Sequence, residues 1–166
     1  DLFAIRTLGF RGEALASIAA ISHLRLVTRP HDDPVGTELL AHGGTITDLR
    51  EIGCPPGTEF EVRQLFFNTP ARLKFLKSDQ TETGHVIELL NAISLCHHGL
   101  SLRCLQNGRE TLLRPASTHL LSHIGAWLGR QTAEAMAPVS LELPTLRVEG
   151  FVGKPETARG NRSAQL

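Results

Sequence analysis

The sequence predicts an α+β fold, in which helices alternate with antiparallel hairpins. Strong helix formers with apolar residues at helical spacing fill three stretches, residues 13–21, 79–97 and 117–128. Shorter apolar runs flank glycine turns at residues 42–44 and 107–108, a pattern typical of hairpins. The 166 residues, 41% of them hydrophobic, are enough to bury a core. They fit one medium domain, or one small domain with part of another.

The first part of the chain is predicted to be a helix over residues 13–21 followed by strands. The expected strands are residues 24–28, 37–41, 45–50 and 58–62. In the last of them, Phe60 and Val62 alternate with Glu59 and Glu61, which predicts a half-buried strand with its apolar side chains inward.

Two helices are expected next. Thr69 is suited to the N-cap and Pro70 to the first position of a helix that would carry Leu73, Phe75 and Leu76. The helix from about Asp79 to His97 is predicted to bury one stripe and to end at Gly99. The expected members of that stripe are Val86, Leu89, Leu90, Ile93 and Cys96.

The rest of the chain predicts two hairpins around a helix. Residues 100–105 and 109–113 would form the first hairpin, joined by Asn107-Gly108. Pro115 breaks the pattern, and Ser117 is suited to cap a helix. That helix would carry Leu120, Leu121, Ile124, Trp127 and Leu128. Strands follow at residues 139–143 and 146–152, and we expect a domain boundary near Pro115.

Composition excludes several classes of protein. Seventeen basic side chains balance seventeen acidic ones, which argues against a polycation that binds through bulk charge. No apolar run has the length of a membrane span, and no signal peptide opens the chain. Three cysteines without a CxxC motif indicate reduced thiols in a cytoplasmic protein. Because Tyr is absent and aromatic residues make up 5%, base-stacking platforms for single strands are not expected.

A glycine-punctuated stretch from Thr7 to Leu15 leads into the first helix. The first amides of a helix lack internal partners, and the helix dipole is positive there, so such a place suits a phosphate. Taken alone, the pattern favours an ordinary turn over an anion site.

Three longer stretches of sequence are more specific than this glycine pattern. "TLGFRGEALASIAAISHL" resembles the third nucleotide-binding motif of the MutL family of DNA mismatch repair proteins, which are GHKL ATPases. "GTEFEVRQLFFNTPARLKFLKS" resembles the fourth ATPase motif of that family. "RVEGFVGKPETARGNRS" is similar to the end of the N-terminal region in bacterial members. The resemblance runs in order across essentially the whole chain.

The resemblance implies an ATP lid and part of an ATP pocket. The implied ATP-binding residues are Leu8, Gly9, Phe10, Arg11, Gly12, Glu13, Ala14, Leu15, Gly57 and Thr58. The Thr58 hydroxyl would help to hold the adenine end, whereas β propensity alone makes it an ordinary strand residue. We interpret residues 68–72 as the start of a helix, with Arg72 a surface residue or an inter-domain salt-bridge partner, and nominate no catalytic residue.

In the family, the general-base Glu and the Mg-holding Asn precede the lid, and a phosphate-binding Lys follows further on. The start at Asp1 and the stop at Leu166 indicate an excised fragment. We therefore expect the parent protein, with ATP and Mg, to be an ATPase, and this fragment to be inactive alone. The resemblance leaves open an endonuclease in a C-terminal domain.

Two further clusters carry side chains that could bind a ligand. Cys96, His97, His98 and Cys104 lack the spaced pairs of a zinc site, so buried thiols are favoured and no metal site is predicted. Lys154, Arg159 and Arg162 lie in a predicted loop with Arg147 nearby. They are either solvated surface or, as the resemblance implies, phosphate contacts to DNA.

Together these observations predict residues 1–115 as the later half of a GHKL α/β sandwich. Residues 116–166 would begin a second, ribosomal-protein-like domain. The implied partners are a second MutL chain, a MutS-type recognition protein and duplex DNA, in the cytoplasm. The implied function is an ATP-driven dimeric clamp that couples mismatch recognition to strand incision. The alternatives are another GHKL ATPase and a non-enzymatic DNA-binding or scaffold module.

Overall fold

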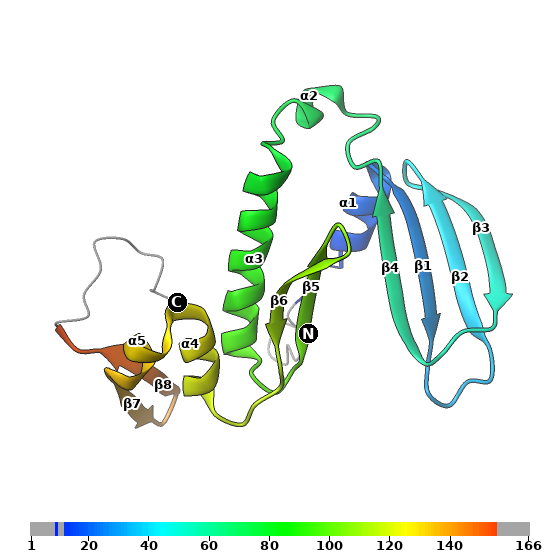
Figure 1. Cartoon of the computed structure of the whole chain (residues 1–166). Helices are drawn as coiled ribbons and strands as arrows, with labels where there is room; N and C mark the ends of the chain where they lie inside the picture. Colours follow the sequence, from blue (N-terminus) through cyan, green and yellow to red (C-terminus); the bar gives the residue numbers. More distant parts are fainter. Residues whose placement is uncertain (1–8, 10–11, 156–166) are drawn as a thin grey trace. The chain divides into compact units, whose positions relative to one another are not determined.

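A computed structural model describes residue 9 and residues 12–155 of the chain (Figure 1). The chain divides into two compact units, Asp1–Leu76 and Lys77–Leu166. All strand pairs in the described residues are antiparallel, and helices and strands are mixed along the chain, so the α+β prediction is confirmed.

The first unit is a four-stranded sheet with one short helix before it and one after it. Its elements are α1 (Ala14–Ala20), β1 (His23–Arg29), β2 (Gly36–His42), β3 (Thr45–Ile52), β4 (Gly57–Arg63) and α2 (Pro70–Leu73). The strand order is β3-β2-β1-β4, and α1 packs against β1 and β2. All four predicted strands are present, and the glycine turn at Gly43 and Gly44 joins β2 to β3 with φ of +58° and +87°.

The register gives this sheet one apolar face. Leu24 lies opposite Ala41 and Val62, and Leu26 lies opposite Phe60. The predicted alternation in β4 is therefore correct in direction, but Phe60 and Val62 remain 39% exposed, so the predicted burial is wrong. The reason is that α1, the short helix that packs on this sheet, lies mainly against β1 and β2 rather than against β4.

The helix predicted at Thr69-Pro70 begins at that place and is short. Pro70 occupies the first turn, and Thr69 is the N-cap residue without a side-chain capping bond. The helix ends at Leu73, so Leu76 and Phe75 lie beyond it, and the Phe75 side chain is 80% exposed.

The second unit contains a long helix, two hairpins and two short helices. Its elements are α3 (Asp79–Cys96), β5 (Leu102–Gln106), β6 (Arg109–Arg114), α4 (Leu120–Leu128), α5 (Arg130–Glu134), β7 (Met136–Leu143) and β8 (Leu146–Gly153). The β5–β6 turn has φ of +52° at Asn107 and +77° at Gly108, as the sequence predicts. Among the described residues of the second unit, the buried apolar ones are Leu112, Ile124 and Ala133.

The buried stripe of α3 differs from the predicted one. Val86, Leu89 and Cys96 are exposed, whereas Asn91 and Ser94 are buried. The reason is polar contact with the β5–β6 hairpin, since the Gln106 side chain donates to Thr83 and the Arg114 side chain donates to Asn91.

The following helix, α4, begins three residues later than its predicted cap. The Ser117 hydroxyl accepts from the amide of His119, the residue before α4, rather than from an amide inside the helix. α5 was not predicted. No described helix has the length and apolar content needed to cross a membrane.

Candidate functional site

The predicted lid residues lead directly into α1. Gly12 has φ +67°, a left-handed conformation that only glycine adopts easily, and a Cβ at this position would meet nothing within 4 Å. Glu13 is the N-cap residue of α1, and Ala14 and Leu15 form its first turn, all three exposed. Gly9 is also exposed. The predicted residues Leu8, Phe10 and Arg11 lie outside the described residues.

The second group of predicted residues lies at the start of β4. Gly57 has φ +130° and is exposed. Thr58 faces Thr28 of β1, with 2.8 Å between their hydroxyl oxygens. Both threonines are on the apolar face of the sheet, where the hydroxyl pair is a polar spot beside Phe60 and Leu26.

Both groups therefore belong to the first unit and come from separate elements. Within the part of the chain that the structure describes, no hydrogen bond links Gly12–Leu15 to Gly57–Thr58. What connects them is the sheet, because α1 packs on β1 and β1 pairs with β4.

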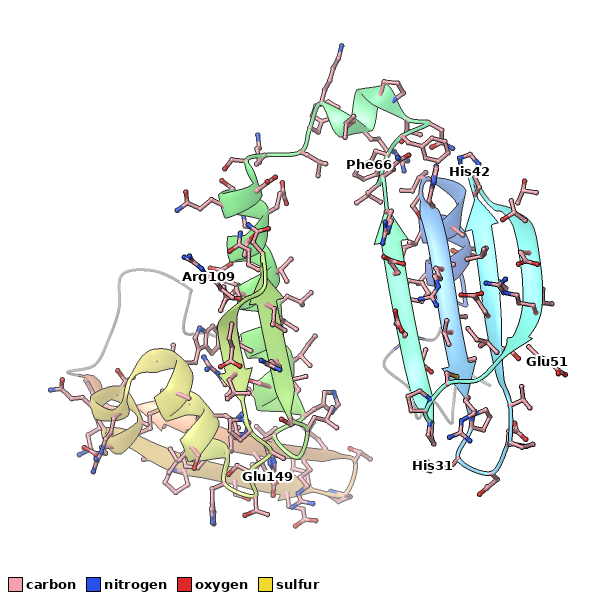
Figure 2. The ribbon with its side chains drawn as sticks, turned by 45° about the vertical axis from the view of Figure 1, so that its right-hand side comes forward. His31, His42, Glu51, Phe66, Arg109 and Glu149 are labelled. Atoms are coloured by element: carbon pink, nitrogen blue, oxygen red, sulfur yellow. The ribbon has the colours of Figure 1, made fainter. Side chains whose placement is uncertain are left out.

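Two segments distant in sequence form hydrogen bonds to the C-terminal end of α1. The Asn68 side-chain amide donates to the Ala20 carbonyl oxygen at 2.9 Å, and the Gly44 amide donates to the Ala19 carbonyl oxygen at 2.8 Å. The Phe66 amide donates to the Ile21 carbonyl oxygen at 2.7 Å. Figure 2 shows His42 and Phe66 at the same end of the sheet, with His31 at the other. These bonds satisfy carbonyls that the helix leaves unpaired.

A buried carboxylate organises the polar face of the sheet. Glu38 is 2% exposed and accepts from Arg25 Nε at 2.7 Å and from Arg50 Nε at 2.6 Å. The hydrogen bond from Arg25, then the one from Arg50, hold the pKa of Glu38 below its ordinary value against the effect of burial. The same bond raises the pKa of Arg25, which also pairs with Glu59 at 3.0 Å. This network is structural, since Arg side chains occupy both oxygens of Glu38.

An aromatic cluster lies at the end of the sheet where α1 is fastened. The His23 and His42 rings are 3.9 Å apart between centroids, and Phe67 lies 4.8 Å from each. This cluster packs the loop after β4 against the sheet at the fastened end of α1.

The predicted DNA-contact residues are only partly described. Lys154 is exposed and follows β8, whereas Arg159 and Arg162 lie outside the described residues. Arg147 pairs with Glu149 on the same strand, so its charge is balanced locally. Arg72 is exposed and forms no ion pair with any described residue.

The cysteines do not gather into a metal-binding set. Cys96 is exposed, and Cys54 and Cys104 are partly exposed, which corrects the expectation of buried thiols. No group of three or more His, Cys, Asp or Glu side chains that could hold a metal ion is found among the described residues.

Sequence reasoning missed Glu38 and its two arginines, and it missed the contact of Asn68 with α1. Arg25, Glu38 and Arg50 occupy three different strands, so only the register brings them together. A lone Glu inside the apolar run of β2 was the one available signal.

Solved structures resemble this fold. It matches the Aquifex aeolicus MutL ATPase domain complexed with ADP with a TM-score of 0.70 and 34% identity, over 78% of this chain and 52% of that one. It also matches the ATPase domain from the mismatch repair endonuclease MutL of the same organism with a TM-score of 0.66 and 26% identity, over 88% of this chain and 57% of that one. The fold is thus that of MutL-type ATPase domains.

Sequence comparison is more specific. The chain is 46% identical to the DNA mismatch repair protein MutL of Symbiobacterium thermophilum over 165 residues, which are 99% of this chain and 26% of that protein. It is 44% identical to MutL of Methanoculleus marisnigri over 98% of this chain and 28% of that protein. No protein-family model matches the chain. The chain belongs to the MutL family of DNA mismatch repair proteins, and it spans about a quarter of the length of these relatives.

Proposed function

We propose that this chain supplies the lid and part of the floor of the ATP site in a MutL-type ATPase. That ATPase would work as an ATP-driven dimeric clamp that couples mismatch recognition to strand incision. The observation that carries the proposal is the 34% identity and shared fold with a MutL ATPase domain whose structure contains ADP.

The residues present fit a nucleotide. Gly12 has the left-handed conformation and the open surroundings that let a backbone approach phosphates closely. Gly9, Gly12, Glu13, Ala14 and Leu15 would lie along the phosphates, together with the neighbouring Leu8, Phe10 and Arg11. Gly57 and Thr58 would lie at the adenine end, where the Thr58 hydroxyl is already oriented by Thr28. ATP would supply a phosphoanhydride bond to be hydrolysed.

The described residues do not form a magnesium site of their own. Carboxylates are the usual protein ligands of Mg²⁺, and no suitable cluster of them occurs here. In the family that the chain resembles, the general-base Glu and the Mg-holding Asn precede the lid, and on that resemblance we assign both to parts of the parent protein other than this chain. On this proposal the 166 residues alone do not hydrolyse ATP.

The wider role follows from the family. Partners would be a second MutL chain, a MutS-type recognition protein and duplex DNA, in the cytoplasm. Residues 1–115 would form part of the ATPase domain, and residues 116–166 would begin the second domain. Lys154, with Arg159 and Arg162, would contact DNA phosphates through loop charges.

A titration with a fluorescent ATP analogue tests the proposal. It compares the complete N-terminal ATPase region containing this sequence with its Gly12→Ala variant. The nucleotide-bound lid is expected to need φ +67° at this position, whereas an alanine in the free lid can leave that conformation and save about 1 kcal/mol, so we expect about fivefold weaker binding. Gly53→Ala is the matched control, because Gly53 is exposed, has open surroundings and no positive φ. Equal affinities for all three proteins would contradict the proposal.

A further inference from the structure

We infer that a small cavity in the second unit, between Arg114 and His123, binds an oxyanion of the phosphate class. The cavity lies where the end of β6 and the segment after it meet α4. Its volume is about 140 Å³, and it is lined by Arg114, Pro115, Ala116, Ser117, Ser122, His123 and Ala126. It shares no residue with the proposed ATP site, and the inference does not rest on that function.

Arg114 brings a positive charge without a carboxylate partner among the described residues. Its Nη2 donates to Asn91 Oδ1 at 2.9 Å, and its Nη1 donates to the Leu113 carbonyl oxygen at 3.0 Å. Both acceptors are neutral. The Nε atom is buried and has no hydrogen-bond partner. Buried charges in proteins are normally paired, so this guanidinium favours an anion as its missing partner.

His123 provides the second group. It is 3% exposed, and neither Nδ1 nor Nε2 has a hydrogen-bond partner. An imidazole always carries at least one N–H donor, and a buried unpaired donor costs about 1–3 kcal/mol. Its neighbour His98 does not relieve this cost, since His98 Nδ1 is engaged with the Ser117 carbonyl oxygen at 2.8 Å. The two histidine rings are 6.3 Å apart between centroids.

The surroundings of these groups select an anion. Among the described residues that line the cavity none is acidic, whereas Ser117 and Ser122 are polar. The Ser117 hydroxyl donates to the His119 carbonyl oxygen at 3.4 Å and accepts from the His119 amide at 3.1 Å, so Ser122 is the serine whose hydroxyl is available to an anion. Ser122 lies in the first turn of α4, a nine-residue helix with no side-chain cap and no acidic residue in that turn. The positive end of the helix dipole therefore adds to the charge of Arg114.

Size is the remaining criterion. The small side chains of Ala116, Ser117, Ser122 and Ala126 leave the space open, and 140 Å³ corresponds to between about four and five waters at ~30 Å³ each. An ion with four oxygen atoms fits such a space. The source is either free phosphate or a phosphodiester of nucleic acid, and the recognising chemistry is the same.

Calorimetric titration of the 166-residue chain with inorganic phosphate, at ionic strength held constant with sodium chloride, tests the inference. We expect saturable binding at one site. Arg114→Lys removes the Nε donor and keeps the charge, so affinity should fall about tenfold or more. Arg109→Lys, at the exposed start of the same strand (Figure 2), is the matched control and should bind like the native chain.

A second variant keeps the test decisive if Arg114→Lys does not fold. His123→Phe preserves an aromatic ring and removes both unpartnered nitrogens. We expect a higher melting temperature without phosphate and the loss of the stabilisation that phosphate gives the native chain. Displacement of bound phosphate by a short DNA duplex would assign the site to nucleic acid, and its absence would assign it to the free ion. No saturable phosphate binding, or equal binding by the native chain and both cavity variants, would overturn the inference.

Discussion

The side-chain amide of Asn68 donates a 2.9 Å hydrogen bond to the backbone carbonyl oxygen of Ala20, across 48 positions of sequence. Asn68 thereby fastens the end of α1 opposite to its glycine-rich approach. Asn68 and Phe66, which follow β4, thus hydrogen-bond to the C-terminal end of the predicted lid helix α1. A helix fixed at its C-terminus and entered through glycine at its N-terminus is suited to order on ligand binding.

Replacing Asn68 with alanine tests this relationship. The Ala20 carbonyl loses its donor, so we expect the free energy of unfolding to fall by about 1 kcal/mol. Urea unfolding of the chain measures it. Lys74→Ala, an exposed neighbour on the same segment, should leave the midpoint unchanged, and equal midpoints for both variants would refute the assigned role.

The buried carboxylate of Glu38 predicts a specific pH dependence. Its folded-state pKa lies below the ordinary value of 4.5, so its contribution to stability is present above pH 4.5. That contribution is lost as the pH falls below 4.5 toward the lower folded-state value. We therefore expect Glu38→Gln to lower the melting temperature at pH 7, and to differ less from the native chain as the pH falls.

Glu51→Gln is the control for that comparison, because Glu51 is exposed on the neighbouring strand β3 (Figure 2). Melting curves from pH 7 to pH 3 should show almost no difference between this variant and the native chain. A Glu38→Gln effect that stays constant across this range would show that the ion pairs with Arg25 and Arg50 do not stabilise the sheet.

Gly36 is predicted to be intolerant of any side chain. A Cβ there would lie 2.3 Å from Cys54 Sγ and 3.1 Å from the Thr28 carbonyl oxygen. We expect Gly36→Ala to destabilise the chain by about 1–3 kcal/mol in urea unfolding. Adding Cys54→Ala should recover part of the loss, whereas Gly53→Ala should be close to neutral. A neutral Gly36→Ala would show that strands β2 and β3 are less tightly constrained than described.

Local signals in the sequence predicted much of this fold. Turn chemistry identified both glycine hairpin turns, and the predicted start of α3 at about Asp79 is confirmed. The sequence analysis did not identify its N-cap residue, Ser78, whose hydroxyl accepts from the Thr81 amide. The buried face of α3 could not be predicted, because Asn91 is buried through its bond with Arg114 of a distant strand. Burial of Glu38 likewise depends on side chains from two other strands. α5 was not predicted because a glycine such as Gly129, which has φ +94°, is typical of a helix end, and here a second helix begins directly after it.

The candidate nucleotide site was likewise predictable only in part, because some of its geometry depends on contacts between distant strands. The conformation of Gly12 and the start of α1 follow from local sequence. The pairing of Thr58 with Thr28 depends on strand register, and its expected role came from family resemblance alone.

The DNA-contact proposal predicts a change in salt dependence. In the complete N-terminal region, neutralising Lys154, Arg159 and Arg162 should weaken duplex binding equally for every sequence. The slope of log K against log salt should fall in magnitude by about 0.9 for each lost contact. Binding titrations of the triple alanine variant at several salt concentrations measure it. An unchanged slope would identify these residues as solvated surface.

Hydrogen exchange tests the lid assignment most directly. In the complete N-terminal ATPase region, saturating a non-hydrolysable ATP analogue should slow amide exchange in residues 9–15 and around Gly57 and Thr58. Exchange in α3 and in the β5–β6 hairpin should change much less, because no residue of these elements is assigned to the nucleotide. Nucleotide binding that leaves exchange in residues 9–15 unchanged would contradict the account.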